Sequence, residues 1–171
     1  MTDTQHGGSD GDLDQVVADL IRGLEKMPHW PGISFRGATA GDSFLTHAGV
    51  LVSQGLTATS RDSRVATENF TTPGIYAFLG VHGRAIEQVS AHPEEREVVF
   101  LPGSLFSVAT TVRYDTHVVT VVEELDLERD PDSPKSVLDD VLRDVAAHLQ
   151  RDRDASTLLI ASPGKFAGDV F

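Results

Sequence analysis

The sequence predicts an α+β fold in which a sheet rich in antiparallel strands is accompanied by a helix near each end of the chain. Helical periodicity occurs near the two ends, and β-rich segments follow one another from residue 75 to residue 125. A run of strands between helices is typical of α+β domains, whereas a doubly wound sheet needs alternating strands and helices. A length of 171 residues suits one domain. We expect residues 1–11 to form a flexible tail and residues 12–171 to form that domain.

The first helix is predicted over residues 13–27. Ser9 and the aspartates that follow it suit a helix N-terminus, where carboxylates are favourable, and Pro28 ends the helix. One face is apolar at steps of three and four residues, through Leu13, Val16, Val17, Leu20, Ile21, Leu24 and Met27.

Shorter elements are predicted next. Strands are expected at 33–36, 50–52 and 56–60. The first of them ends at Gly37, and the segment 38–49 is compatible with either a short helix or a loop. A short helical segment begins at Asp62 and runs through Phe70.

The β-rich part and a second helix complete the predicted domain. Strands are expected near 75–80, 84–90, 97–101, 106–114 and 118–125. A charged linker over 126–133 precedes a helix with Ser133 as its N-cap and Pro134 as its first residue. The apolar face of this helix consists of Val137, Leu138, Val141, Leu142, Val145 and Leu149. A last strand is predicted at 158–161.

Composition excludes several classes of function. The formal charge of −12 argues against a nucleic-acid partner, because phosphate contacts need clustered Lys and Arg. The apolar runs are too short to span a membrane, so we expect no membrane partner. The N-terminal residues lack the pattern of a signal peptide, which favours a cytoplasmic location or export by a route without one. The seven histidines show no metal-ligand spacing and the chain has no cysteine, so no metal is expected.

The most informative motif is a pair of glutamates, Glu95 and Glu97, immediately before an apolar strand. Alternation along a strand would place both carboxylates on one face and Arg96 on the other. Such a run is commonly a solvated strand edge in an acidic chain. Two like charges held together are, however, also suited to acid, base or cation-stabilising chemistry.

Three separated motifs place this pair in a known order. Ile33-Ser34-Phe35-Arg36-Gly37 is followed by Gly55-Leu56-Thr57-Ala58-Thr59-Ser60-Arg61-Asp62, and then by Pro93-Glu94-Glu95-Arg96-Glu97-Val98-Val99-Phe100-Leu101-Pro102-Gly103. Together they resemble the Arg–Ser–Glu class of mono-ADP-ribosyltransferases, which includes arginine-modifying bacterial toxins. The resemblance covers roughly residues 12–125 and is most specific at the glutamates. It implies two packed, roughly perpendicular, mostly antiparallel sheets around an NAD cleft.

The resemblance also implies an activity and its residues. The enzyme would transfer ADP-ribose from NAD, its substrate, to a protein with an exposed arginine and would release nicotinamide. Glu97 would stabilise the sugar cation that forms as nicotinamide leaves, and Glu95 would position and deprotonate the acceptor guanidinium. Ser60 would help to order the glutamate. NAD-binding roles fall on Arg36, Gly37, Thr59 and Phe70, with the arginine gripping the diphosphate through its planar fork.

The chain departs from the family pattern in two places. The first serine of the family's Ser-Thr-Ser is Ala58, so Glu97 lacks its usual hydroxyl partner unless Ser60 compensates. The loop 90–93 lacks an aromatic residue that often contacts the target. Two alternatives therefore stay open, namely an NAD glycohydrolase that uses water as acceptor, and a catalytically impaired relative that acts as a binding module. The resemblance gives no place to the helix and strand after Leu127.

Overall fold

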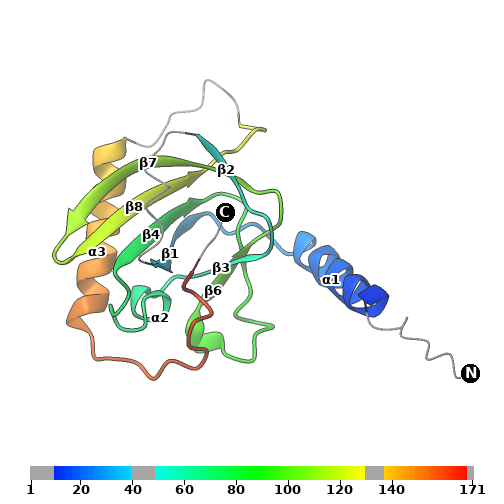
Figure 1. Ribbon diagram of the computed structural model, residues 1–171. Helices are drawn as coiled ribbons and strands as arrows, with labels where there is room; N and C mark the ends of the chain where they lie inside the picture. Colours follow the sequence, from blue (N-terminus) through cyan, green and yellow to red (C-terminus); the bar gives the residue numbers. More distant parts are fainter. Residues whose placement is uncertain (1–9, 40–48, 130–136, 169–171) are drawn as a thin grey trace, which may run out of the picture.

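The computed structural model describes residues 10–39, 49–129 and 137–168 and arranges them as one large sheet with helices at its side and end (Figure 1). The helices are α1 (Asp10–Glu25), α2 (Ser63–Ala66) and α3 (Leu138–Asp154). The strands are β1 (Gly32–Ala38), β2 (Val50–Val52), β3 (Thr57–Ser60), β4 (Gly74–Gly80), β5 (Arg84–Ala85), β6 (Glu97–Phe100), β7 (Leu105–Tyr114) and β8 (His117–Glu124). The predicted α+β class is confirmed.

The sheet has the strand order β2-β7-β8-β4-β1-β3-β6-β5, and its pairings are antiparallel except that of β4 with β8. β1 pairs with β4 along its whole length, from Gly32 opposite Gly80 to Ala38 opposite Gly74. Its other neighbour, β3, meets it only at Phe35 opposite Ser60. A narrow seam between β1 and β3 therefore joins a five-stranded part to a three-stranded part. The two expected sheets are thus continuous at this one seam.

Apolar side chains cover both faces of the sheet, because successive residues of a strand point to opposite sides. In β4, Ile75 and Ala77 belong to a core beneath α3, where Leu149 is fully buried. Tyr76 and Phe78 belong to a second core on the other face. That second core holds three phenylalanines, Phe78, Phe100 and Phe106, whose ring centroids lie 5.3 to 5.6 Å apart. Aromatic pairs at such separations add to the burial of apolar area.

The two long helices differ in how they use their apolar faces. α3 lies along the sheet, whereas α1 projects from the body, as Figure 1 shows. Leu13, Val16, Val17 and Leu20 are at least half exposed, and only near its end does α1 bury a leucine, Leu24. The helix also begins at Asp10, inside the segment expected to be a tail. No helix within the described ranges is long and apolar enough to cross a membrane.

Four predicted elements need correction. The strand expected at 84–90 is only β5, because the chain turns after Ile86, whose carbonyl accepts bonds from two later amides. The helix expected from Asp62 through Phe70 ends at Ala66, and Glu68, Asn69 and Phe70 all have left-handed backbones. α3 begins at Leu138 with Val137 at its cap; the expected Ser133 and Pro134, like most of the ambiguous segment 38–49, lie outside the described residues.

The last strand expected, at 158–161, is wrong. Residues 156–160 have no regular secondary structure. The backbone of Leu158 is hydrogen-bonded by the side chain of Asn69 instead of by a neighbouring strand. Asn69 Oδ1 accepts from Leu158 N at 2.9 Å, and its Nδ2 donates to Leu158 O at 3.0 Å. Leu158 is therefore attached to the loop after α2 rather than to the sheet.

Candidate functional site

Arg36 lies at the seam between β1 and β3, and its guanidinium spans the space where the two strands separate. It is 8% exposed. Its Nη1 donates to Ala58 O of β3 at 2.7 Å and to Lys165 O at 3.2 Å. Its Nη2 donates to Ala167 O at 3.0 Å and its Nε to Gly168 O at 3.2 Å. The guanidinium thus connects β1, β3 and the 162–168 segment.

Gly37 brings the 162–168 segment against β1. Its amide donates to Phe166 O at 2.8 Å, and the residue forms a parallel bridge with Ala167. A Cβ on Gly37 would lie 2.6 Å from Thr72 Cγ2 and 2.9 Å from Ala66 O, both far too close. Glycine is therefore required here by the packing of the loop after α2, quite apart from any ligand.

Glu95 and Glu97 are buried, at 1% and 6% exposure, so they are not a solvated strand edge. Strand alternation does not bring them together. Glu95 ends a 3₁₀ turn over Pro93–Glu95, Arg96 has a left-handed backbone with φ of 49°, and Glu97 begins β6. Their carboxylates nevertheless converge on one cation. Lys165 Nζ lies 2.8 Å from Glu95 Oε2 and 2.7 Å from Glu97 Oε2.

Lys165 and Glu95 fix each other's charge. Burial by itself raises the pKa of Glu95, but hydrogen bonds from Lys165 and Ser162 and the lysine's charge outweigh burial, so the pKa falls below its ordinary value. Burial likewise tends to lower the pKa of Lys165, yet its bonds to the two glutamates raise it above the ordinary lysine value. Both groups are therefore charged near neutral pH. One ammonium between two carboxylates leaves a site that still attracts cations.

The hydroxyl strand β3 supports the glutamates through backbone rather than carboxylate contacts. Ser60 pairs in register with Glu97, but its Oγ donates to Glu95 O at 2.6 Å and accepts from Asp62 N at 3.0 Å. It thus holds the turn that carries Glu95. Thr59 is fully buried, and its Oγ1 bonds Ser34 Oγ and Val98 O, each at 2.8 Å. Thr59 therefore ties β1, β3 and β6 together at the seam.

Phe70 lies elsewhere. Its ring is 4.9 Å from the Arg153 guanidinium carbon and 5.9 Å from the His117 ring, in a pocket between the loop after α2 and the end of α3. The structure brings together Arg36, Gly37, Ser60, Glu95 and Glu97 but does not place Phe70 beside the glutamates. Within the described ranges, no group of three or more metal-ligating side chains gathers.

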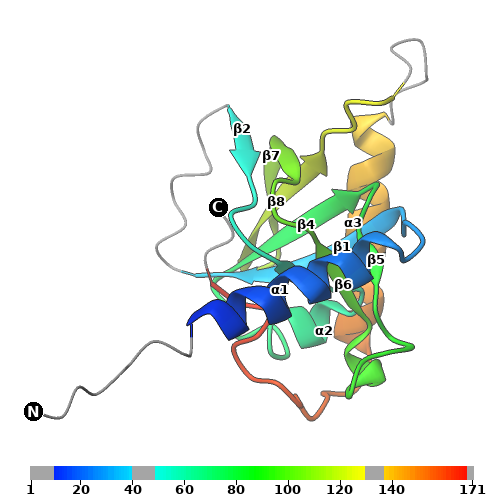
Figure 2. The ribbon, with the colours of Figure 1, turned by 90° about the vertical axis from the view of Figure 1, so that its right-hand side faces the viewer.

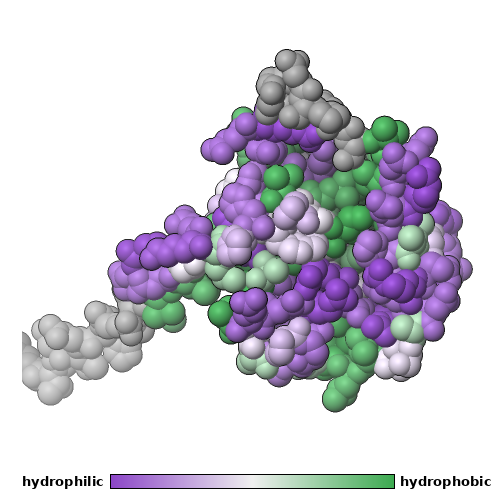
Figure 3. Space-filling view, turned by 180° about the vertical axis from the view of Figure 1, so that it is seen from behind, coloured by the Kyte–Doolittle hydropathy of each residue, from purple (hydrophilic) through white to green (hydrophobic). Residues whose placement is uncertain are grey.

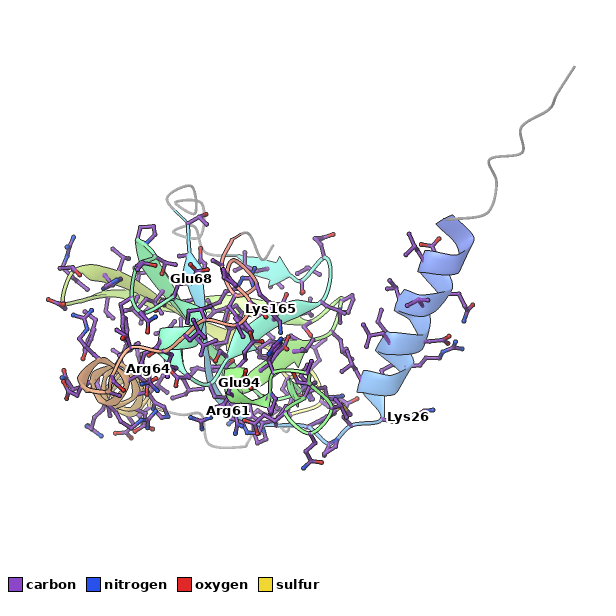
Figure 4. The ribbon with its side chains drawn as sticks, turned by 90° about the horizontal axis from the view of Figure 1, so that it is seen from below. Lys26, Arg61, Arg64, Glu68, Glu94 and Lys165 are labelled. Carbon is purple, nitrogen blue, oxygen red and sulfur yellow. The ribbon has the colours of Figure 1, made fainter. Side chains whose placement is uncertain are left out.

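Lys165 is the residue that sequence reasoning missed. It was visible only as part of a Pro-Gly-Lys segment near the end of the chain. Its position is set by several contacts, including the bond from Gly164 N to Glu68 Oε1 at 2.5 Å. In Figure 4 the chain that carries Lys165 crosses the body between the labelled Glu68 and Glu94. No pattern in the sequence pairs Lys165 with the glutamates, because 70 and 68 positions separate it from them and a nearer cation, Arg96, lies between the two.

Solved structures of similar fold are bacterial ADP-ribosyltransferases. The ADP-ribosyltransferase Vis with its M6 inhibitor has a TM-score of 0.60 at 24% identity, covering 74% of this chain and 63% of that one. Vis, a toxin from Vibrio splendidus, has also been solved with agmatine, with a TM-score of 0.59 at 24% identity and coverages of 78% and 67%. Exoenzyme S from Pseudomonas aeruginosa, with human 14-3-3 protein beta and bound to Carba-NAD, has a TM-score of 0.56 at 20% identity and coverages of 80% and 70%.

These likenesses show that the chain has the ADP-ribosyltransferase fold of bacterial toxins, as the sequence resemblance predicted. No family model matches the chain, and no curated protein matches its sequence significantly. The chain spans less than two thirds, 63%, of the length of the Vis chain with the M6 inhibitor.

Proposed function

We propose that this protein is an NAD-dependent mono-ADP-ribosyltransferase that transfers ADP-ribose to a protein arginine and releases nicotinamide. The observation that supports this most is the convergence of Glu95 and Glu97 on one cation, next to Arg36, at the seam of an ADP-ribosyltransferase fold. NAD would be a substrate, and no metal enters the proposal.

Each charged group suits one step of that reaction. Arg36 would bind the diphosphate through the planar fork of its guanidinium. As the bond between ribose C1′ and nicotinamide breaks, nicotinamide leaves with the electron pair and the sugar becomes cationic. A fixed carboxylate stabilises such a cation, and Glu97, held at the start of β6, would provide it.

Glu95 would act on the acceptor. An arginine guanidinium is protonated at neutral pH and is a poor nucleophile until it loses a proton. A carboxylate within hydrogen-bond reach can position the guanidinium and accept that proton as its nitrogen bonds to C1′. The lysine bound at this point supports a cationic acceptor. The agmatine in the Vis structure carries a guanidinium as well.

The test is an assay with NAD labelled in its adenylate part, with agmatine or a mixture of proteins as the acceptor. It is run on wild type and on Lys165→Met, in which no lysine bridges Glu95 and Glu97. Glu97→Gln should lower nicotinamide release by about 100-fold or more, because it removes charge stabilisation of the transition state. Glu94→Gln is the matched control, since Glu94 is a highly exposed neighbour in the same turn, and it should leave the rate unchanged. The proposal fails if neither protein releases nicotinamide, or if Glu97→Gln releases it as fast as its parent.

The same assay separates transfer from hydrolysis. A transferase should lose labelling of the acceptor in Glu95→Gln while some nicotinamide is still released to water. Release of nicotinamide with no labelled acceptor, at a rate insensitive to Glu95→Gln, would identify a glycohydrolase instead.

A further inference from the structure

The 162–168 segment occupies the donors that an NAD diphosphate would need. Arginine offers N–H groups on Nε, Nη1 and Nη2, and in Arg36 all three nitrogens donate to main-chain carbonyls. Among the described residues, the carbonyls of Lys165, Ala167 and Gly168 accept these bonds from within the segment, and that of Ala58 accepts from β3. A bidentate diphosphate would have to take the same N–H groups. Segment and diphosphate therefore exclude each other at Arg36.

The same segment occupies the position of the acceptor cation. The Lys165 ammonium bridges Glu95 and Glu97, and the carbonyl of the same residue accepts from Arg36. The backbone of the segment lies beside β1 at the bridge between Gly37 and Ala167, where it pairs with the strand edge as a bound peptide can. A turn that carries a basic side chain thus fills both halves of the site.

The segment is attached by polar bonds and by the buried side chain of Phe166, which belongs to neither of the two cores of the sheet, so its release leaves those cores packed. Upstream, Arg64 Nη1 donates to Ser156 O at 2.7 Å and Asn69 brackets Leu158. Closer to the site, the Gly164 amide bonds Glu68, and Gly164 has a φ of +80° that favours glycine. The Lys165 side chain is still 32% exposed, which makes its ion pairs accessible to competing solutes. Figure 4 shows this path from Arg64 past Glu68 to Lys165.

We propose that the 162–168 segment is an internal pseudosubstrate. Its carbonyls replace the NAD diphosphate on Arg36, and the Lys165 ammonium replaces the acceptor guanidinium at the glutamates, so NAD binds only when the segment leaves. This inference rests on the proposed function. It also specifies the acceptor that the site holds, which is a basic side chain carried on a turn beside β1.

Carba-NAD, an analogue of the substrate, is the probe, with its affinity for the full chain measured by calorimetry. Lys165→Met removes the bridge between the glutamates. Gly164→Val keeps every charge but places a β-branched residue at φ +80°, which strains the turn that delivers Lys165. Both variants should bind carba-NAD about tenfold more tightly than wild type, as expected if the segment closes the site about 90% of the time. Lys165→Arg keeps the bridging cation and is the control, with an affinity close to wild type.

A peptide with the sequence of residues 161–168 provides the second arm. Added to Gly164→Val, it should weaken carba-NAD binding, whereas the same peptide with methionine at the lysine position should not. Equal carba-NAD affinities in wild type and both variants would overturn the inference and leave the proposed function standing. Weaker binding in both variants would also overturn it and would make Lys165 a residue that positions the glutamates.

Failure of the proposed function has a different signature. In that case no protein of the set binds carba-NAD although all melt cooperatively at similar temperatures, and the inference falls with it.

Discussion

Lys165 favours the ionised form of the Glu95 carboxylate. Burial alone would raise the pKa of Glu95, but the hydrogen bond and the charge of Lys165 help to lower it below the ordinary glutamate value. The pKa of Lys165 in turn lies above the ordinary lysine value. The carboxylate therefore contributes stability above the pKa of an unfolded glutamate, and this is lost as pH falls through the lower native value. The ammonium contributes below the pKa of an unfolded lysine, and this is lost as pH rises through the higher native value. Between those limits the contribution of the cluster is constant.

Replacing Lys165 should reverse the titration of Glu95. In Lys165→Met, burial of Glu95 persists without its cation, so its pKa should rise above the ordinary glutamate value. The variant should then lose stability, relative to wild type, as pH rises from acid toward neutral. Carboxyl-carbon NMR titration gives the pKa, and urea unfolding at several pH values gives the free energy. A Glu95 pKa that stays low in the variant would show that another donor, such as Ser162, holds the carboxylate charged.

At the scale of single elements, the seam between β1 and β3 explains why the site is where it is. β1 is fully paired with β4 on one side, while on the other side only one residue pair is formed. The strand therefore presents Gly37 to another segment, which pairs there with Ala167. Thr59 and Arg36 bridge the diverging strands, so the seam keeps its shape without a ladder of hydrogen bonds.

Gly37→Ala should destabilise the protein by about 1–3 kcal/mol, because the new Cβ would overlap Thr72 and the Ala66 carbonyl. Gly55→Ala is the matched control, since a Cβ there meets nothing within 4 Å and the backbone is not left-handed. It should be neutral or slightly stabilising, by less than about 1 kcal/mol. Urea unfolding compares the two variants. Equal effects would mean that the loop after α2 moves aside for the methyl group.

On the scale of the whole molecule, the two long helices have different functions in stability. α3 seals one core and carries Asp152, whose Oδ2 accepts from the amide and hydroxyl of Ser63 at the start of α2. Its length also brings the following segment back to the seam, as the orange path in Figure 2 shows. α1 stands away from the body in the space-filling view as well (Figure 3). We therefore expect global stability to depend on α3 and little on most of α1.

Two leucine truncations test this division. Leu149→Ala in α3 should cost about 2–5 kcal/mol, because Leu149 is fully buried and the change leaves a cavity. Leu20→Ala in α1 should change stability by less than about 0.5 kcal/mol, because half of that side chain is already exposed. Thermal and urea unfolding of both variants give the comparison. A large cost for Leu20→Ala would show that α1 packs against something in solution.

The sequence by itself determined most strands and the residues that carry charge at the site. Runs of β-type residues bounded by turn residues predicted β2 as observed, and predicted β1, β4, β6, β7 and β8 to within one or two residues at each end. The order of the three motifs predicted the fold, in which Arg36 and the glutamates all contact Lys165. Such runs are informative here because central strands such as β4 and β6 are buried on both faces and need consecutive apolar or β-branched residues.

Only the tertiary structure decided what surrounds these residues. The turn at Glu95, the end of α2 and the unpaired segment after α3 depend on positive φ values and side-chain bonds that no periodic pattern encodes. The contact of Lys165 with Glu95 joins residues 70 positions apart, and it exists because α3 returns the chain to the seam. Ser60 Oγ donates to the backbone carbonyl of Glu95 rather than to the expected carboxylate. The sequence could not show this, because a hydrogen bond depends on which atoms lie close together in space.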